Sequence, residues 1–306
     1  MTAVSPTLRS VGAPGLPEPR AVLTLFKPVT WFPPMWAFAC GIVSAGQPLG
    51  ERRWLLPLGI LLCGPLVCGT SQAVNDWFDR HVDAINEPDR PIPSGRVPGT
   101  WGLTFAIIGS LASLGVAFAI SLPAALATFI GLVLAWAYSA PPVRLKQNGW
   151  WGNLAVGLCY EGLAWVTGTA LVLGGALPPA MVLLVALLYS LGCHGIMTIN
   201  DYKSLDGDRR LGIGSLPARL GPERAAIVAC VVMLVPQLVV IGLLLHLGHP
   251  VAAGAVGLVV AVQIPCMKRW LGAPRELAPW YNGTGVVLYV LGMMASAVAL
   301  GAGAGA

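Results

Sequence analysis

The sequence is dominated by long intervals without any charged side chain. No Asp, Glu, Lys or Arg occurs between Lys27 and Glu51, Arg53 and Asp76, Arg96 and Arg144, or Arg224 and Lys268. Each interval has room for one or two helices of about 20 residues, the length that crosses the hydrocarbon of a bilayer. Only 10% of the 306 residues are charged, whereas soluble domains average about 25%. The sequence therefore predicts an all-α polytopic membrane protein, and it argues against a soluble enzyme, a disordered chain and a nucleic-acid-binding protein.

Turn signals divide these intervals, the stretch from Lys146 to Lys203 (where Glu161 is the only charge) and the apolar C-terminal stretch into nine expected transmembrane helices. Their ranges are about 29–47 and 54–74, two helices meeting at 121–123, two meeting near 174–179, two meeting near 246–250, and a last helix over 281–301. We expect residues 1–27 to form an N-terminal tail, residues 28–301 the nine-helix domain, and residues 302–306 a flexible C-terminal tail.

The basic residues indicate the orientation of these helices. With nine spans, 16 of the 18 Lys and Arg residues fall in loops on one side, and only Arg52 and Arg53 fall on the other. Loops rich in Lys and Arg stay in the cytoplasm. The sequence thus predicts a cytoplasmic N-terminus and a C-terminus on the opposite side.

An acidic cluster follows the second expected span. It reads NDWFDRHVD and contains Asp76, Asp79 and Asp83 at positions i, i+3 and i+7. If the helix continues past the membrane edge, the three carboxylates share one face and repel one another. A cation would relieve the repulsion, and Mg²⁺ is commonly held by one or two carboxylates together with substrate phosphates. A solvated polar cap on the helix end is the alternative interpretation.

A second acidic cluster lies at the same membrane side, four spans later. It also begins with Asn-Asp and contains Asp201, Asp206 and Asp208. Asp201 and Asp208 are seven residues apart and share a helical face if the helix persists that far. Two such clusters predict two halves of one metal–diphosphate site, and nearby basic residues can bind the remaining phosphate charge. Diphosphate leaves readily once it is neutralised, and an apolar cavity in the membrane would protect an allylic cation from water.

These motifs resemble the UbiA superfamily of membrane prenyltransferases, over about residues 20–300. The first cluster matches the family motif N-D-x-x-D-x-x-x-D at Asn75, Asp76, Asp79 and Asp83. The second family motif, D-x-x-x-D, is altered here, because Ser204 stands at its second acidic position. Within the superfamily, the strings NDWFDRHVDAINEPDRPIPSGRVP and YSAPPVRLKQNGWWGN resemble the chlorophyll and bacteriochlorophyll synthases, and CYEG at 159–162 resembles the bacteriochlorophyll branch.

The resemblance implies a Mg²⁺-dependent, cytoplasm-facing active site in a UbiA-type bundle. It implies that geranylgeranyl or phytyl diphosphate esterifies the propionate of bacteriochlorophyllide a, with proteins of pigment biosynthesis or assembly as partners. The carboxylates expected to be catalytic and to hold Mg²⁺ are Asp76, Asp79, Asp83, Asp201 and Asp208, with Asp206 as a further metal ligand and Asp208 favoured over it by helical phase. The residues expected to bind diphosphate or order the site are Asn75, Arg80, Arg90, Tyr138, Arg144, Lys146 and Lys203.

Three further residues are candidates for the tetrapyrrole or cation pocket. Glu161 is the sole formal charge inside a predicted span, and intramembrane acids mark functional sites by default. His194 could ligate the central Mg²⁺ of a chlorin, although a hydrogen-bonded histidine in helix packing is the more common case. Trp77 could line the prenyl channel or pack in the core.

Four alternatives stay open at this point. A chlorophyll synthase differs only in its acceptor, and another UbiA-type enzyme, acting on a quinone precursor or making haem O, would share the metal site. An ion-coupled transporter could also use acidic clusters, although its sites usually lie at the membrane midplane. A pigment-binding assembly protein without activity is the last alternative.

Overall fold

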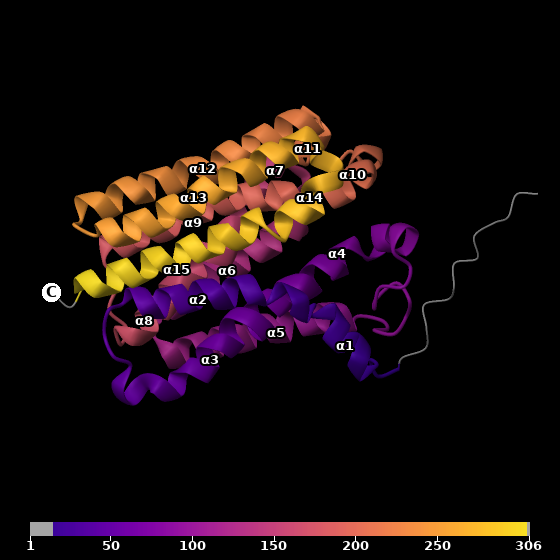
Figure 1. The fold of residues 1–306 in the computed structure, drawn as a ribbon. Helices are drawn as coiled ribbons and strands as arrows, with labels where there is room; N and C mark the ends of the chain where they lie inside the picture. The colour runs from indigo at the N-terminus through magenta and orange to yellow at the C-terminus, as the bar shows by residue number, and fades with distance from the viewer. Residues whose placement is uncertain (1–14, 305–306) are drawn as a thin grey trace, which may run out of the picture.

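The computed structural model describes residues 15–304 and is built from helices alone over that range, apart from one isolated bridge between Asn148 and Gly214. The helices lie side by side in a single bundle (Figure 1). Their bounds are α1 Pro19–Leu25, α2 Phe32–Ser44, α3 Leu56–Leu61, α4 Gly69–Asn86, α5 Trp101–Ile120, α6 Leu122–Ser139, α7 Gly149–Gly157, α8 Ala164–Val172, α9 Ala180–Asp201, α10 Leu205–Leu211, α11 Leu216–Leu220, α12 Pro222–His246, α13 Pro250–Gly272, α14 Pro274–Asn282 and α15 Gly285–Ala304.

Short helical turns join several of these helices into longer rods. A π-helix, η3 (Leu62–Cys68), connects α3 to α4, and a second, η5 (Leu158–Leu163), connects α7 to α8. The remaining turns are 3₁₀: η1 Pro28–Thr30, η2 Gly50–Leu55, η4 Leu145–Gln147 and η6 Tyr202–Ser204. Within the described residues, eight rods are long and apolar enough to cross a membrane. The first of the nine expected spans corresponds to α2, which has only 13 residues.

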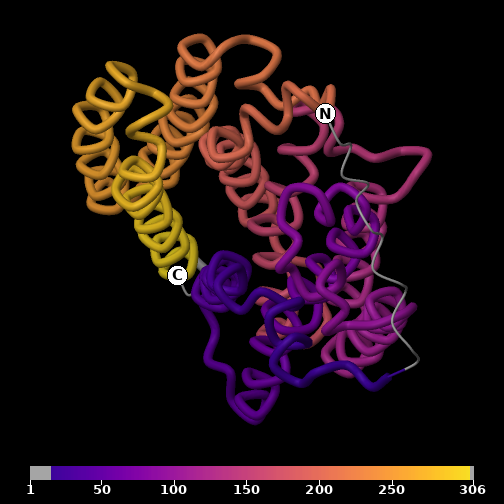
Figure 2. Tube along the Cα trace, turned by 90° about the vertical axis from the view of Figure 1, so that its right-hand side faces the viewer, coloured from indigo at the N-terminus to yellow at the C-terminus, as the bar shows by residue number. Residues whose placement is uncertain are grey.

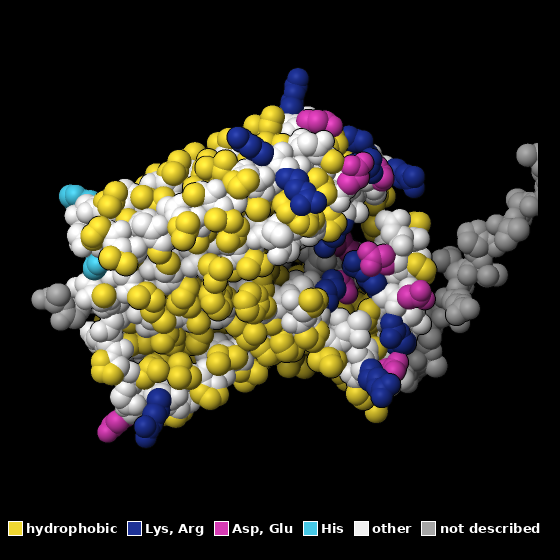
Figure 3. Space-filling model, viewed as in Figure 1, with side chains coloured by type: hydrophobic (Ala, Val, Ile, Leu, Met, Phe, Trp, Pro, Cys, Tyr) yellow, Lys and Arg dark blue, Asp and Glu magenta, His cyan; other side chains and the backbone are white. Residues whose placement is uncertain are grey.

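The rods close into a ring of packed neighbours. Helix α2 packs on α8 and α15, α15 on α13, α13 on α12, α12 on α9, α9 on α7, and α7 on α6, which also contacts α4 and α5. Figure 2 shows the C-terminal helices on one side of this arrangement and the N-terminal half on the other. Apolar side chains cover the middle of the molecule, and charged side chains gather at one end (Figure 3). This distribution is that of a multi-pass membrane protein.

Glycines set the closest approach within the ring, between α2 and α8. A Cβ atom added to Gly41 would lie 2.1 Å from the Trp165 carbonyl oxygen, and one added to Gly168 would lie 2.1 Å from the Phe38 carbonyl oxygen. Side-chain hydrogen bonds join the same helices, since Thr169 donates to the Gly41 carbonyl at 2.9 Å. Small residues at such crossings allow membrane helices to pack backbone against backbone.

The end of the expected N-terminal tail is packed structure. Helix α1 buries Ala21 and Leu25 against Ala73 and Val74 of α4. Residues 1–14 lie outside the described residues. The chain then turns at Lys27, whose backbone has a positive φ of 45°. At the other end, α15 runs to Ala304, so part of the expected C-terminal tail is helical, and residues 305–306 are outside the described range.

Candidate active site

The first acidic cluster lies on α4, which continues as a helix to Asn86 as expected. Asp76 and Asp83 are buried, with 2% and 6% of their surface exposed, and Asp79 is partly exposed. Four basic side chains surround them. Lys27 is 2.7 Å from Asp76, Arg90 is 2.9 Å from Asp83 and 3.4 Å from Asp76, Arg144 is 3.7 Å from Asp79, and Lys146 pairs with Asp79.

In the structure, basic side chains neutralise the carboxylates of the first cluster. The repulsion among its carboxylates, which we predicted a metal ion would relieve, is balanced here by lysine and arginine side chains. Among residues 15–304, no group of three or more His, Cys, Asp or Glu side chains is close enough to hold a metal ion as arranged. The donor types nevertheless suit Mg²⁺, because carboxylate and amide oxygens are its preferred ligands.

A polar cleft of about 530 Å³ opens beside Asp76. Its lining residues come from the end of α1, the end of α4 and the loop after α4: Thr24, Lys27, Asp76, Asn86, Glu87, Pro88, Asp89, Arg90 and Pro91. A hollow among charged side chains is visible at this end of the molecule in Figure 3. The loop over residues 87–96 therefore forms one wall of the site.

Glu87, in this loop, interacts electrostatically with basic residues near both acidic clusters. Two hydrogen bonds from Arg90, at 2.7 and 2.8 Å, lower the pKa of Glu87, and the positive charges of Arg90, Lys27 and Lys203 act in the same direction. Burial lowers the pKa of the Lys146 ammonium, and the neighbouring Asp79 carboxylate opposes that shift. Lys203 lies within the second cluster, between Asp201 and Asp206, so the two clusters are within electrostatic range of each other.

The second cluster departs from the expected geometry. Helix α9 ends at Asp201, and a 3₁₀ turn precedes α10, so Asp201 and Asp208 do not share one continuous helix. Ser204, which replaces the family's acidic residue, lies 3.1 Å from both the Asp201 carbonyl and the Asp208 carboxylate. Ser215 donates to the same Asp208 oxygen at 2.6 Å. Helix α10 ends at Leu211 and is followed by Gly212, which has a φ of 69°, a conformation that glycine readily adopts.

Asp206 and Asp208 have different surroundings. Asp208 is buried, with 8% of its surface exposed, and its carboxylate is held by the two serines. Asp206 is exposed and pairs with Arg275 of α14. The structure thus offers Asp208 as the internal carboxylate, and Asp206 as a surface residue.

The loop over residues 140–149 joins the two clusters. Arg144 and Lys146 contact Asp79 of the first cluster. Three residues later, the Gly149 amide donates to the Gly214 carbonyl at 2.8 Å, next to Ser215. Asn153 of α7 then donates to Asp201 at 3.1 Å. A single segment of about a dozen residues therefore contacts both acidic clusters.

The structure adds residues that the motif analysis missed. Lys27 belongs to neither acidic motif, and yet it forms an ion pair with Asp76. Asn153 is part of the quoted string YSAPPVRLKQNGWWGN, which was a usable signal. Ser139 accepts a hydrogen bond from Asn75 at 3.2 Å, and Asn75 also donates to Asp79 at 3.0 Å.

Other expected site residues lie apart from the cleft. The Arg80 guanidinium lies 4.1 Å from the centre of the Trp77 ring and donates to the Trp77 carbonyl. Trp77 itself faces Gly102 of α5. Lys203 is exposed, and Tyr138 precedes Ser139 at the end of α6.

Glu161 and His194 are buried, and each has side-chain polar atoms without a close hydrogen-bond partner within residues 15–304. One carboxylate oxygen of Glu161, and both ring nitrogens of His194, have no partner among the described residues. His194 lies on α9, seven residues before Asp201, and its ring centre is 5.3 Å from that of Trp150.

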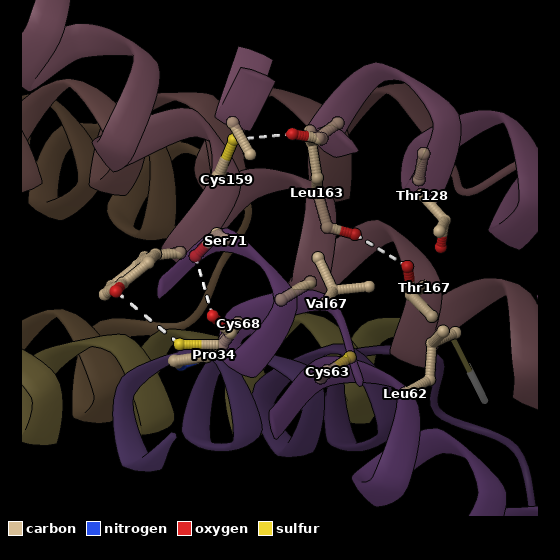
Figure 4. A pocket seen from close by; sticks show the side chains of 15 residues that line it. Pro34, Leu62, Cys63, Val67, Cys68, Ser71, Thr128, Cys159, Leu163 and Thr167 are labelled. Carbon is tan, nitrogen blue, oxygen red and sulfur yellow. Dashed lines mark hydrogen bonds between the residues drawn. The ribbon is translucent and has the colours of Figure 1, made fainter. Parts of the chain in front are cut away.

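A mainly apolar pocket begins one to two turns beyond the first cluster, deeper in the bundle (Figure 4). The two π-helices, η3 and η5, both contribute to its wall, and π-helical turns often occur at functional sites. Gln72 and Cys68 contact the Tyr160 hydroxyl at 3.2 and 3.5 Å and so join the two π-helical rods. The residues that line the pocket are Pro34, Leu62, Cys63, Val67, Cys68, Ser71, Ala127, Thr128, Gly131, Ala135, Cys159, Tyr160, Leu163, Ala164 and Thr167.

The sequence is similar to known membrane prenyltransferases over most of its length. The model of the UbiA prenyltransferase family matches residues 30–282. The bacteriochlorophyll synthase 33 kDa chain of Rhodobacter capsulatus is 55% identical over 299 residues, which cover 97% of each chain. The chloroplastic chlorophyll synthase of Arabidopsis thaliana is 39% identical over 90% of this chain and 73% of its own.

A solved structure shows the same fold. It is a UbiA homologue from Archaeoglobus fulgidus bound to GPP and Mg²⁺, with a TM-score of 0.71 and 20% identity over 90% of this chain and 99% of that chain. The family match covers most of the sequence, and the bundle and its paired Asn-Asp clusters agree with it. This chain belongs to the UbiA prenyltransferase family.

Proposed function

We propose that this enzyme esterifies the propionate of bacteriochlorophyllide a with geranylgeranyl or phytyl diphosphate and releases diphosphate. The observation that carries the proposal is that one segment, residues 144–153, contacts both Asn-Asp clusters at the same end of the bundle, with an apolar pocket deeper between the helices. The 55% identity to the bacteriochlorophyll synthase chain of Rhodobacter capsulatus favours a tetrapyrrole as the acceptor. Chlorophyllide is the alternative acceptor, because chlorophyll synthases match at lower identity.

The diphosphate would bind where the ion pairs now stand. Lys27, Arg90, Arg144 and Lys146 already converge on the first cluster, and each can transfer its contacts from a carboxylate to a phosphate oxygen. Asp76, Asp79 and Asp83, with Asp201 and Asp208 opposite, would hold Mg²⁺. When bound, the metal supplies positive charge that neutralises the leaving diphosphate.

The chain's own residues then position the reacting groups. The allylic C–O bond breaks, and its electron pair leaves with the diphosphate, which the lysines and arginines stabilise. A carboxylate oxygen of the acceptor forms the new bond to the same carbon. Because that carboxylate is ionised at neutral pH, no protein base has to remove a proton. The apolar pocket holds the prenyl chain and keeps water from the developing cation.

The site would face the cytoplasm, in the inner or intracytoplasmic membrane of a bacterium. The loops on the side of the clusters hold 16 of the 18 Lys and Arg residues when nine spans are counted, which supports this orientation. An exposed cysteine introduced at the N-terminus should react with an impermeant thiol reagent only after the membrane is opened.

A direct assay tests the proposed reaction. Detergent-solubilised protein is incubated with bacteriochlorophyllide a and geranylgeranyl diphosphate, and esterified pigment is separated by chromatography. We expect a product that forms with Mg²⁺ and disappears with a chelator, because the carboxylate clusters need the metal to hold diphosphate. If the enzyme esterified chlorophyllide but not bacteriochlorophyllide a, the proposed acceptor would be wrong. Product formed in the presence of the chelator would contradict the proposed role of Mg²⁺.

His194 is the residue we propose to contact the tetrapyrrole. It lies about 10 Å from Asp201 along α9, at 1.5 Å per residue, so a macrocycle beside it could extend its propionate towards the metal site. One of its ring nitrogens could bind the central Mg²⁺ of the pigment, on the side where the partly exposed Trp150 ring packs.

Pigment absorption provides the readout for this contact. Binding of bacteriochlorophyllide a to the unmodified protein should shift the absorption bands, and His194→Ala should abolish that shift. His246→Ala, at an exposed position near the opposite membrane face, is the matched control. An identical shift in the His194 variant would exclude ligation at this site.

A further inference from the structure

We propose that Asn282 is a positioning residue for the second acidic cluster, which it holds in place through Asn200. The inference rests on the proposed function, since it concerns the half of the metal–diphosphate site around Asp201. The side-chain amide of Asn282 donates to the side-chain oxygen of Asn200 at 2.6 Å. The two residues are 82 positions apart in the chain, on α14 and α9. Asn282 belongs to neither acidic motif.

The asparagines that open the two clusters are held in different ways. Asn75 donates to Asp79 at 3.0 Å and to Ser139 at 3.2 Å, so it is fixed within the N-terminal half of the chain. Among the described residues, the side chain of Asn200 has the Met197 sulfur at 3.9 Å and Asn282 at 2.6 Å as its partners. A nitrogen–sulfur contact of that length is weak. The contact with Asn282 is therefore the one that orients the Asn200 amide beside Asp201.

Helix α14 lies at the end of the bundle where the acidic clusters are. Figure 1 shows it at the same end as α10 and the far end of α4. It contacts both α9 and the 3₁₀ turn η6 that follows α9. A turn at Gly283 and Thr284 separates α14 from α15. Because α14 ends at Asn282, this residue lies beside the end of α9, where Asn200 and Asp201 are.

Ring contacts from the same helix hold the residue on the other side of Asp201. The ring centre of Tyr202 lies 5.7 Å from that of Trp270, and Trp270 stacks on Tyr281 at 4.9 Å. All three rings are buried, with at most 5% of their surface exposed. Tyr281 directly precedes Asn282, so one turn of α14 fixes both neighbours of Asp201. Ligands that are held by such outer contacts keep the geometry that a metal needs.

The helix break that carries Asn282 is itself anchored inside the bundle. Gln237 of α12 donates to Gln263 of α13 at 2.9 Å, and Gln263 donates to the carbonyl of Gly285, the first residue of α15, at 3.0 Å. Both glutamines are fully buried. Side-chain hydrogen bonds between membrane helices stabilise their packing. Helices α12 and α13 thus give the end of α14 a fixed support.

Asn282→Ala tests whether this support matters for the reaction. The Mg²⁺ concentration that gives half the maximal rate of prenyl transfer should rise about tenfold, the lower end of the effect of removing an outer partner of a metal ligand. The value of kcat at saturating Mg²⁺ should stay within about twofold, because Asp201 itself is unchanged. Asn282→Ser, whose side chain is one atom shorter than that of asparagine, replaces the alanine variant if that variant does not fold.

The matched control is a polar residue of the same helix break. The Thr284 hydroxyl donates to the Trp280 carbonyl at 2.9 Å, within its own segment. Thr284→Ala therefore removes a hydrogen bond from the break without removing a bond to α9. It should keep both the Mg²⁺ dependence and the kcat of the unmodified enzyme, whereas a change equal to that of Asn282→Ala would assign the effect to a general loosening of the break and overturn the proposal.

Metal binding provides a readout that does not depend on turnover. Mn²⁺ binds to oxygen ligands as Mg²⁺ does, and the free ion can be measured by electron paramagnetic resonance. With inorganic diphosphate present, Asn282→Ala should weaken Mn²⁺ binding about tenfold, and binding as tight as in the unmodified protein would overturn the proposal. Failure of the unmodified protein to bind Mn²⁺ with diphosphate would instead contradict the metal site of the proposed function.

A double variant tests the route through Asn200. If Asn282 acts only by holding Asn200, then Asn200→Ala and the double variant with Asn282→Ala should bind Mn²⁺ equally weakly. Residues that act through one contact give such non-additive losses, whereas independent residues give losses that add. Full additivity of the two substitutions would show that Asn282 does not act through Asn200, and it would overturn the proposal while leaving the proposed function intact.

Discussion

Asp76→Ala should lower kcat/KM for prenyl transfer by at least about 100-fold, the loss seen when one group that stabilises developing charge is removed. Asp76 is almost completely buried, lines the polar cleft and contacts both Lys27 and Arg90. Its loss removes a carboxylate from the proposed metal set and leaves the two cations less well placed for diphosphate. The measurement is the esterification assay on purified variant protein.

Loss of folding has to be separated from loss of chemistry at this position. Asp76→Asn keeps the shape of the side chain but removes its charge, so it should lose nearly as much activity as the alanine variant while melting close to the unmodified protein. His81→Ala, an exposed residue on the same helix, is the control and should keep its activity. Substantial activity in Asp76→Asn would show that this carboxylate does not hold the metal.

Asp201→Ala should cause a loss of similar size, about 100-fold or more. Asp201 ends α9 and accepts a hydrogen bond from Asn153, and through Ser204 it is connected to Asp208. If the two clusters form one site, the loss of either half must prevent productive binding of the metal and diphosphate. We would measure the Mg²⁺ concentration needed for half-maximal rate together with turnover.

The neighbouring acid provides a sharp comparison. Asp206→Ala removes a carboxylate five residues later that is exposed and paired with Arg275, so it should change activity less than about twofold, as expected for an exposed ion pair. Asp208→Ala should resemble Asp201→Ala. If Asp206→Ala were as damaging as Asp201→Ala, the division of these acids into an internal and a surface residue would be wrong.

Most of the fold could be predicted from the positions of charges. Transmembrane helices must be long, apolar and free of unpaired charges, so the charge-free intervals located the rods. The exception is the first span, where the helix itself covers only Phe32–Ser44. The packed end of the N-terminal segment was not predicted, because the burial of Ala21 and Leu25 depends on their fit to α4 rather than on any local pattern.

The candidate site also has a part that could be predicted from the sequence and a part that could not. The spacing of Asp76, Asp79 and Asp83 predicted their common helix, because helical periodicity is a local property. The second cluster could not be placed by periodicity, since α9 ends at Asp201 and a 3₁₀ turn separates it from α10, which carries Asp208. Only the folded chain shows that Ser204 and Ser215 hold Asp208 inside, and that Arg275 holds Asp206 outside.

Local sequence patterns suffice to predict the class of protein, most of the membrane spans, the side on which charge gathers and the two acidic motifs, because hydrophobicity and helical spacing act over neighbouring residues. Helix packing establishes which cations meet which carboxylates, that the loop over residues 140–149 joins both clusters, and that two π-helical rods line an apolar pocket. These features depend on contacts between residues far apart in the chain, such as Lys27 with Asp76 and Cys68 with Tyr160. Such contacts exist only once the helices have packed.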